Sequence, residues 1–179
     1  MDIDKRFERK SFNDLEFGAL FIGVIARQYV VRAIKAYAPT TGGDQDDYFV
    51  TVGPFENGDA QYPMLTHPNR LYDDPILELK GAYQISPSLE PDDIMKDLPS
   101  GNDRFGAIML GNDRILMGVA TTESGIRRLH CWLDLKTGEV MTPPSHSDFI
   151  AIRRWRLTEP TENSAPRTIF EFPPKTEGT

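Results

Sequence analysis

The chain has 179 residues, of which 39% are hydrophobic and 26% are charged, and its formal net charge is −7. This length accommodates one ordinary domain or two small ones, and the composition is typical of a folded globular protein. No apolar run approaches the roughly 18 residues that a membrane-spanning helix requires. The composition therefore excludes an intrinsically disordered chain and a helical membrane protein.

The cysteine content and the first residues bear on where the protein works. Cys131 is the single cysteine, which excludes an intramolecular disulfide and a zinc site with four cysteine ligands. The mixed-charge start Met1–Arg6 is followed by no apolar core of the kind that an export signal carries. Both observations indicate a reducing, cytoplasmic setting, and we expect no association with a membrane.

Acidic charge is concentrated in the middle of the chain. Residues 38–100 carry three Lys/Arg against twelve Asp/Glu, a balance of −9. Residues 1–37 and 105–157 each carry seven against five, a balance of +2. Phosphates repel an acidic segment, so nucleic acid is the less suitable partner there, whereas a basic protein would be attracted to it. The competing interpretation is that these acids only keep surface loops hydrated.

In chain order, residues 2–16 carry apolar side chains at helical spacing and predict a short helix. β-Branched and aromatic residues dominate 17–37 and favour two strands, although one amphipathic helix competes. The further elements expected in the first half are a loop at 39–47, a strand at 48–52, an irregular proline-containing connection at 60–75 and a strand at 76–85.

In the second half, residues 88–98 predict another short helix, because the first turn is acidic and Pro91 stands near its start. After residue 158, proline and small polar residues indicate an extended tail. Within it, Ile169–Phe172 is an apolar island that docks either on its own domain or as an added strand on another chain. The strands expected before the tail are 105–110, 114–120, 127–135 and 149–157.

A seven-residue pattern occurs in both halves. Residues 17–23 read Phe-Gly-Ala-Leu-Phe-Ile-Gly and residues 105–111 read Phe-Gly-Ala-Ile-Met-Leu-Gly, so four of the seven positions are identical and the others stay apolar. The surrounding elements follow a similar order, which favours an internal duplication. We therefore predict a β-rich α+β fold of two similar small antiparallel β units, each preceded by a short helix. The expected ranges are 1–87 and 88–158 for the units and 159–179 for the tail, and the alternative is that the two units fuse into one continuous β structure.

Catalytic and metal-binding patterns are weak. Ser145–Asp148 contains a nucleophile, a base and an acid, but sequence neighbours point apart, and a polar turn explains the run better. If 127–135 is a strand, His130 and Cys131 face opposite sides, and Cys131 shares its side with leucines as a buried thiol. The histidines lack metal-ligand spacing, and no glycine-rich phosphate loop is present. We predict no catalytic residue, metal or cofactor.

Two surfaces remain as candidates for binding. Acidic loops of the first unit suit a basic partner protein, while arginines interleaved with tryptophan in the second unit suit a protein interface or a single-stranded nucleic acid. The bland interpretation of the second set is a hydrated sheet face with core tryptophans. The acidic set is Asp44, Asp46, Asp47, Asp73 and Asp74, and the basic-aromatic set is Arg127, Arg128, Arg154, Arg156 and Trp155.

The leading hypothesis is a non-enzymatic interaction module, in the manner of an inhibitor or immunity protein, that binds another protein through its acidic loops. The first alternative is nucleic-acid binding through the basic-aromatic set. The second is a small-ligand or hydrolytic protein with a pocket between the units that holds His130 or His146. One acidic and one basic lobe would also permit head-to-tail self-association into a homo-oligomer.

Overall fold

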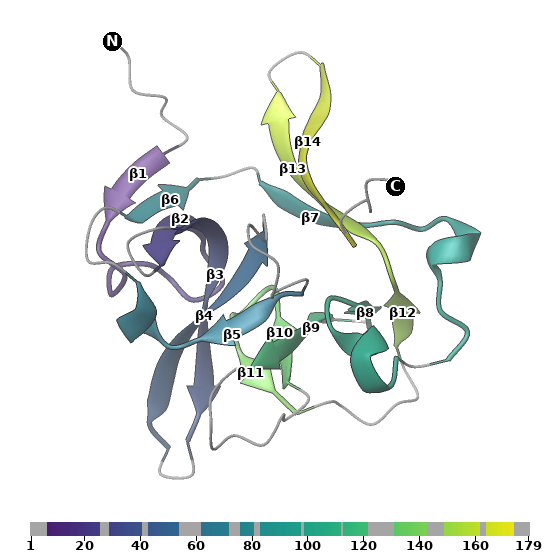
Figure 1. Ribbon diagram of the computed structural model, residues 1–179, viewed down its shortest axis with the longest axis horizontal. Coiled ribbons are helices and arrows are strands. Elements are labelled where there is room, and N and C mark those ends of the chain that lie inside the picture. Colours follow the sequence, from purple (N-terminus) through teal and green to yellow (C-terminus); the bar gives the residue numbers. More distant parts are fainter. Residues whose placement is uncertain are drawn as a thin grey trace.

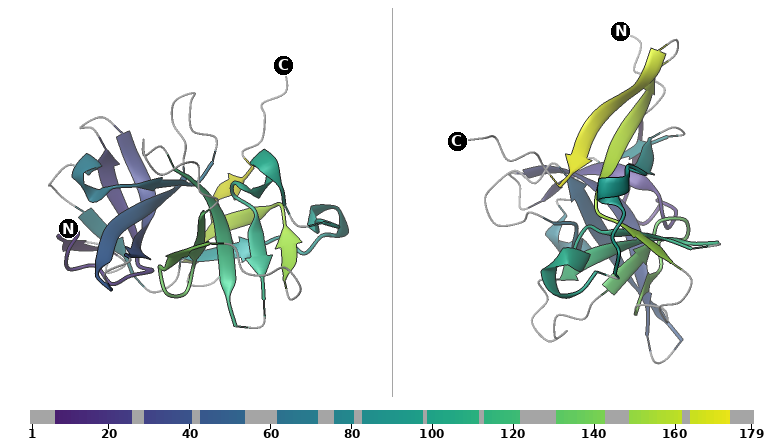
Figure 2. Two further views of the ribbon diagram at one scale, coloured as in Figure 1. Left: turned by 90° about the horizontal axis from the view of Figure 1, so that it is seen from below. Right: turned by 90° about the vertical axis from the view of Figure 1, so that its right-hand side faces the viewer.

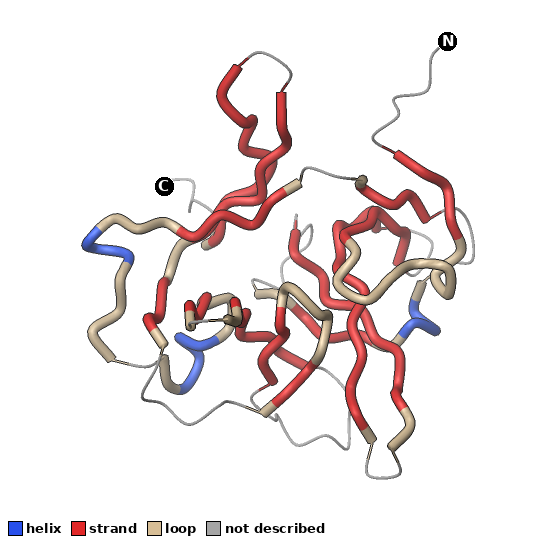
Figure 3. The backbone as a smooth tube through the Cα atoms, turned by 180° about the vertical axis from the view of Figure 1, so that it is seen from behind, coloured by secondary structure: helices blue, strands red, loops and turns tan. Residues whose placement is uncertain are grey.

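The computed structural model describes residues 7–25, 29–40, 43–53, 62–71, 76–80, 83–97, 99–111, 113–121, 131–142, 149–161 and 164–173. Strands dominate these ranges, and the helical segments within them are three short 3-10 turns (Figures 1 and 3). The strands are β1 (Phe7–Lys10), β2 (Leu20–Ile25), β3 (Tyr29–Pro39), β4 (Gln45–Gly53), β5 (Met64–Thr66), β6 (Ile76–Leu79), β7 (Gln84–Pro87), β8 (Ile108–Leu110), β9 (Ile115–Thr121), β10 (Cys131–Asp134), β11 (Val140–Met141), β12 (Ile150–Ile152), β13 (Trp155–Thr161) and β14 (Ser164–Phe172).

The predicted short helices are wrong, although the prediction of a β-rich chain is confirmed. Where 2–16 was expected to be helical, β1 pairs with β6 over four positions, from Phe7 opposite Leu79 onward. Where 88–98 was expected to be helical, the structure has only the 3-10 turn η2 (Pro91–Asp93), after which Ile94 bridges to Ile152. Segments this short are marginal as isolated helices, so pairing with a sheet outweighs their local preference.

One large sheet runs through both halves of the chain. Its strand order is β1-β6-β2-β3-β4-β5-β9-β10-β11, with β8 attached to β9 and β12 attached to β8. The link between the halves is the parallel pair β5–β9, whereas the neighbouring pairs within each half are antiparallel. The two predicted units are therefore not separate sheets, because each would leave unpaired edges that the other covers.

The predicted extended tail is also wrong over residues 164–172. These residues form β14, which pairs with β13 and, through it, with β7 in a second sheet of three strands. The hairpin of β13 and β14 extends beyond the body of the molecule (Figures 1 and 2). Strand β13 spans Trp155–Thr161 and so crosses the expected boundary between residues 158 and 159.

The two halves share one strand order and one register. The order β6-β2-β3-β4-β5 in the first half corresponds to β12-β8-β9-β10-β11 in the second. The halves also meet through two equivalent hydrogen bonds, in which the Tyr37 N–H donates to the Gly138 carbonyl (2.9 Å) and the Ala120 N–H to the Pro63 carbonyl (2.8 Å). The equal register is seen in two rows of residues in which each residue pairs with the next one across neighbouring strands. The rows are Leu20, Ile34, Val50 and Leu65 in the first half and Ile108, Met117, Leu133 and Val140 in the second.

A glycine bulge explains the seven-residue pattern that occurs twice. Gly18 and Gly106 have φ values of 83° and 81°, a region that favours glycine. The Gly18 N–H donates to the Lys35 carbonyl (2.8 Å), and the Lys35 N–H donates to the Ala19 carbonyl (2.9 Å). In the second half, the Gly106 N–H donates to the Gly118 carbonyl (2.7 Å), and the Gly118 N–H donates to the Ala107 carbonyl (2.9 Å). Two residues of the bulged strand therefore face one residue of the neighbouring strand, and this β-bulge bends β2 and β8 near their starts.

The main core is completed by the last strand. Trp155 is fully buried, its Nε1–H donates to the Gly106 carbonyl (2.7 Å), and its ring stacks on Phe172 with centroids 5.4 Å apart. Phe172 is only 4% exposed, and the partly buried Phe170 packs against the same cluster. The apolar island within the expected tail therefore docks on its own chain, and each fully buried aromatic ring contributes roughly 1.5–3 kcal/mol to folding.

Candidate functional site

Three members of the acidic set, Asp44, Asp46 and Asp47, lie near the closed end of the β3–β4 hairpin. The two strands pair from Arg32 opposite Gly53 to Pro39 opposite Gln45, so the end of the hairpin is held by a long ladder. This end points away from the rest of the sheet (Figure 1). Asp44 and Asp46 are exposed there. The sequence-based placement of these two carboxylates in a loop thus corresponds to a turn and the first residues of β4.

Asp47 differs from its neighbours because it faces a buried lysine. Its Oδ2 lies 3.7 Å from Nζ of Lys35, and its side chain is 37% exposed. Asp73 and Asp74, the other members of the acidic set, lie outside the described residues. The acidic surface that the structure describes therefore consists of two exposed carboxylates and a third that shares its charge with Lys35.

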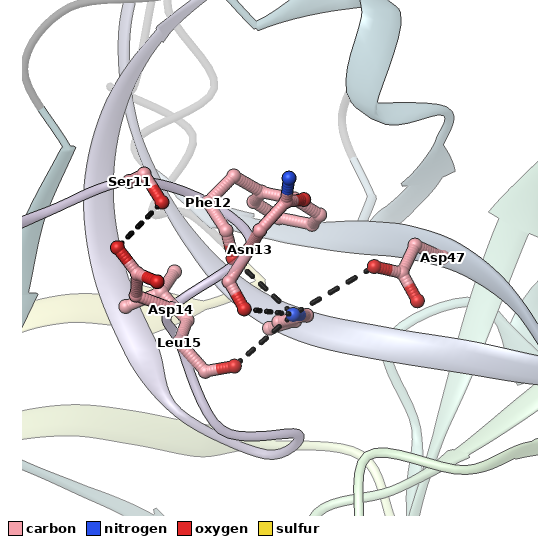
Figure 4. A network of polar contacts seen from close by, with 7 residues as sticks. Ser11, Phe12, Asn13, Asp14, Leu15 and Asp47 are labelled. Carbon is pink, nitrogen blue, oxygen red and sulfur yellow. Dashed lines mark hydrogen bonds and ion pairs between the residues drawn. The ribbon is translucent and has the colours of Figure 1, made fainter.

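Lys35 is the centre of a polar network that sequence reasoning did not identify. The residue is 4% exposed, and its ammonium group donates to the carbonyls of Phe12 (3.2 Å), Asn13 (3.4 Å) and Leu15 (3.0 Å) (Figure 4). It also lies 5.0 Å and 4.8 Å from the ring centroids of Phe12 and Phe17. These contacts satisfy a buried charge and fasten residues 12–17 over the sheet. Because its contacts join this segment to Lys35 of β3 and Asp47 of β4, we assign the network a structural role.

The basic-aromatic set does not form a stacking platform in the described residues. The ring of Trp155 lies in the core and is not available to stack on a base. Arg154 and Arg156 are exposed, and each has an acidic neighbour, with Nε 3.2 Å from an oxygen of Asp93 and 3.6 Å from an oxygen of Glu171. Arg127 and Arg128 lie outside the described residues.

Other chemically interesting residues have structural roles. Cys131 is half-buried, and burial raises the pKa of its thiol above the ordinary value, which lowers its reactivity. His67 caps the 3-10 turn η1 (Pro68–Arg70), since its Nδ1 accepts from the Asn69 N–H (3.2 Å). His130 and the run Ser145–Asp148 lie outside the described residues. No group of three potential metal ligands occurs within the described ranges.

A groove around Tyr83 is the second candidate site. Three adjoining hollows of about 380, 270 and 190 Å³ share this residue. Tyr83 immediately precedes β7 and donates its hydroxyl to Oε1 of Glu159 on β13 (3.1 Å). Two five-stranded sets, β6-β2-β3-β4-β5 and β12-β8-β9-β10-β11, both contribute to the lining. Leu20 and Ile34 come from the first set and Ile115 from the second. The groove therefore lies where the two halves and the three-stranded sheet meet.

The three hollows differ in their chemistry. The middle hollow of about 270 Å³ is lined mainly by aliphatic side chains, and the other two carry charged groups. Sequence reasoning anticipated a pocket between the halves but assigned it histidines, and it gave no signal for Tyr83 or for the arginines of the groove. The aliphatic residues are Leu20, Ile34, Ile85, Ile115, Leu135 and Leu157, the charged residues of the largest hollow are Glu16, Glu78, Lys80 and Lys136, and those of the smallest are Arg32, Glu159 and Arg167.

Comparisons of the chain with protein-family models, with curated proteins and with solved structures found no match. In the part of the chain that the structure describes, no helix is long and apolar enough to cross a membrane.

Proposed function

We propose that this protein is a non-enzymatic, cytoplasmic interaction module that binds a basic partner protein through the end of the β3–β4 hairpin, in the manner of an inhibitor or immunity protein. The observation that supports this proposal is the exposure of Asp44 and Asp46 at the end of a hairpin that points away from the body. The single cysteine of the sequence is compatible with a reducing compartment.

The electrostatics of the hairpin suit association with a cationic surface. Exposed carboxylates keep their hydration and attract opposite charges over a Debye length of about 8 Å at physiological salt. Such charges accelerate encounter and select partners more than they strengthen the final complex. Because the ladder between β3 and β4 already fixes the hairpin, little backbone ordering is required when a partner binds.

A charge-neutralising variant tests this proposal. We would purify proteins captured by the chain from its native host and measure their Kd for the Asp44→Asn/Asp46→Asn variant at several salt concentrations. The expected result is binding at least about tenfold weaker than that of the unaltered protein at low salt, with the difference shrinking as salt increases.

The matched control is Asp92→Asn/Asp113→Asn, which removes the same charge from two exposed positions away from the hairpin. This control should bind as the unaltered protein does. The proposal is overturned if no basic protein is captured, or if the hairpin variant and the control bind the captured protein equally well at every salt concentration.

We also infer that the two five-stranded sets derive from duplication of one ancestral unit without a helix. Their equivalent strand order, equivalent register and repeated glycine bulges support this inference. Its test is an alignment of residues 17–79 with residues 105–152 across many homologous sequences. Similarity no greater than that of shuffled segments would refute it.

A further inference from the structure

We propose that the groove around Tyr83 binds an organic monocarboxylate with an apolar body, such as a medium-chain fatty acid. The middle hollow would take the apolar body, and the smallest hollow would take the carboxylate. Tyr83 lines both hollows, so the proposed ligand is an elongated molecule that extends past this residue. This site is distinct from the acidic hairpin end, because neither Asp44 nor Asp46 lines any of the three hollows.

The middle hollow, of about 270 Å³, has a mainly aliphatic lining that suits the apolar body of a ligand. Ile115 remains 40% exposed at its wall, although it is a large aliphatic residue on a paired strand. Leu157 is fully buried at the same hollow and provides a rigid boundary. Covering such surface removes it from water, which is the main driving force for binding an apolar group. A volume of about 270 Å³ is just below the range of roughly 300–1,000 Å³ of small-molecule sites, which suits a small apolar body.

The smallest hollow offers a carboxylate two guanidinium groups. Arg32 comes from β3 and Arg167 from β14, so two distant segments bring positive charge to one space of about 190 Å³. Within the described part of the chain, neither guanidinium forms an ion pair or a side-chain hydrogen bond. Arginine presents a planar set of donors that matches a carboxylate in a bidentate manner.

The charge balance of this hollow selects a monoanion. Among the described residues of its lining, Glu159 is the single acid, and Tyr83 donates a hydrogen bond to it. Two arginines against one glutamate leave one net positive charge, which one carboxylate neutralises. In the adjoining largest hollow, Glu78 pairs with Lys10 (2.8 Å) and Lys80 pairs with Glu8. The remaining charged residues there, Glu16 and Lys136, are of opposite sign, so that side adds no net charge.

Anion preference is diagnostic because the chain as a whole carries a charge of −7. A non-specific amphiphile site on such a protein would favour cations, whereas the proposed site favours anions. The probe is decanoate below its micellar concentration, titrated calorimetrically into the full chain. Decyltrimethylammonium, which has a similar apolar body and the opposite charge, serves as the paired ligand. We expect saturable binding of decanoate at least about tenfold tighter than that of the cation.

Three variants separate the two ends of the site. Arg32→Gln/Arg167→Gln should weaken decanoate binding at least about tenfold, since hydrogen bonds to a charged group contribute that much or more. Ile115→Asp should also weaken it, because a carboxylate then stands beside the apolar body. The control Arg70→Gln/Arg153→Gln removes the same charge from exposed positions outside the three hollows and should leave binding unchanged.

Circular dichroism and urea denaturation establish that each variant remains folded, and the Ile115→Asp variant supplies the test if the double arginine variant does not fold. The proposal is overturned if decanoate does not bind at millimolar concentration, if the cation binds as tightly, or if the folded groove variants bind decanoate as tightly as the control. These outcomes are independent of the acidic hairpin end, since no residue of that surface is altered.

Discussion

Replacement of Lys35 by methionine tests whether the buried ammonium group holds residues 12–17 over the sheet. Methionine keeps most of the length of the stem and removes the charge and its three donors. The carbonyl of Leu15 is buried where it meets the ammonium group, so it loses its partner without gaining water. The carbonyls of Phe12 and Asn13 are only partly buried at their contacts, and water can replace the lost donor there.

The expected loss follows from these differences. A buried carbonyl left without a donor costs about 1–3 kcal/mol, and the loss of the cation from two aromatic faces costs about 1 kcal/mol more. The release of the ammonium group from its desolvation offsets part of this loss. Asp47 adds little, because its side chain is 37% exposed and its oxygen lies 3.7 Å away. We therefore expect the free energy of unfolding to fall by about 2–3 kcal/mol.

Urea denaturation measures this change. With an m-value of about 2 kcal/mol/M, the midpoint should move down by about 1–1.5 M. Lys136→Met is the control, since Lys136 is exposed and its substitution should change the free energy of unfolding by less than about 0.5 kcal/mol. If Lys35→Met and Lys136→Met destabilise the protein equally, the buried network does not hold the segment and the reasoning is wrong.

The remaining predictions concern a glycine bulge and the single thiol. Gly106→Ala should lower the free energy of unfolding by about 3 kcal/mol in urea denaturation, because its φ is 81° and the added Cβ would overlap the ring of Phe172. Gly43→Ala has a similar φ of 87° and open space, so a loss of about 1 kcal/mol is expected, and equal losses would contradict the steric argument. Burial raises the pKa of Cys131, so at pH 8 iodoacetamide should react with the folded protein at least about tenfold more slowly than with glutathione, and urea should abolish the difference. The pKa of this thiol is higher in the folded than in the unfolded protein. The contribution of the neutral thiol to the free energy of unfolding is therefore complete at a pH below the unfolded pKa, and it is lost as the pH rises towards the folded pKa.

The strand content of the chain was readable from its sequence because alternation and β-branched composition act locally. The expected strand at 48–52 lies within β4, and the expected strand at 105–110 contains β8. The helices were predicted wrongly because residues 2–16 have helical spacing but too few turns to persist alone. Pairing with β6, some seventy residues away, decides their structure, and no local pattern reports that pairing.

The structure of the tail and the candidate sites also depends on long-range contacts that local sequence patterns do not report. Ile169–Phe172 was recognised as an apolar island, but its position in β14 depends on Trp155 and on the bulge at Gly106. Lys35 stands in a strand where alternation does not reveal burial, because the covering segment comes from residues 12–17. The groove at Tyr83 draws its lining from separate strands of both halves, so no motif marks it. Exposed acids, by contrast, were identifiable because Asp44 and Asp46 closely follow Gly42 and Gly43 in the sequence.

The position of Phe172 in the core has a consequence for the order of events during synthesis. Its ring fills the space against Trp155 and Gly106, and these partners precede it by 17 and 66 positions in the chain. A growing chain therefore carries an open core until Phe172 has left the ribosome. Long-range pairing of this kind slows folding and prolongs the exposure of apolar strands to other chains. Assistance by a chaperone would act in this interval, before the last strand closes the core.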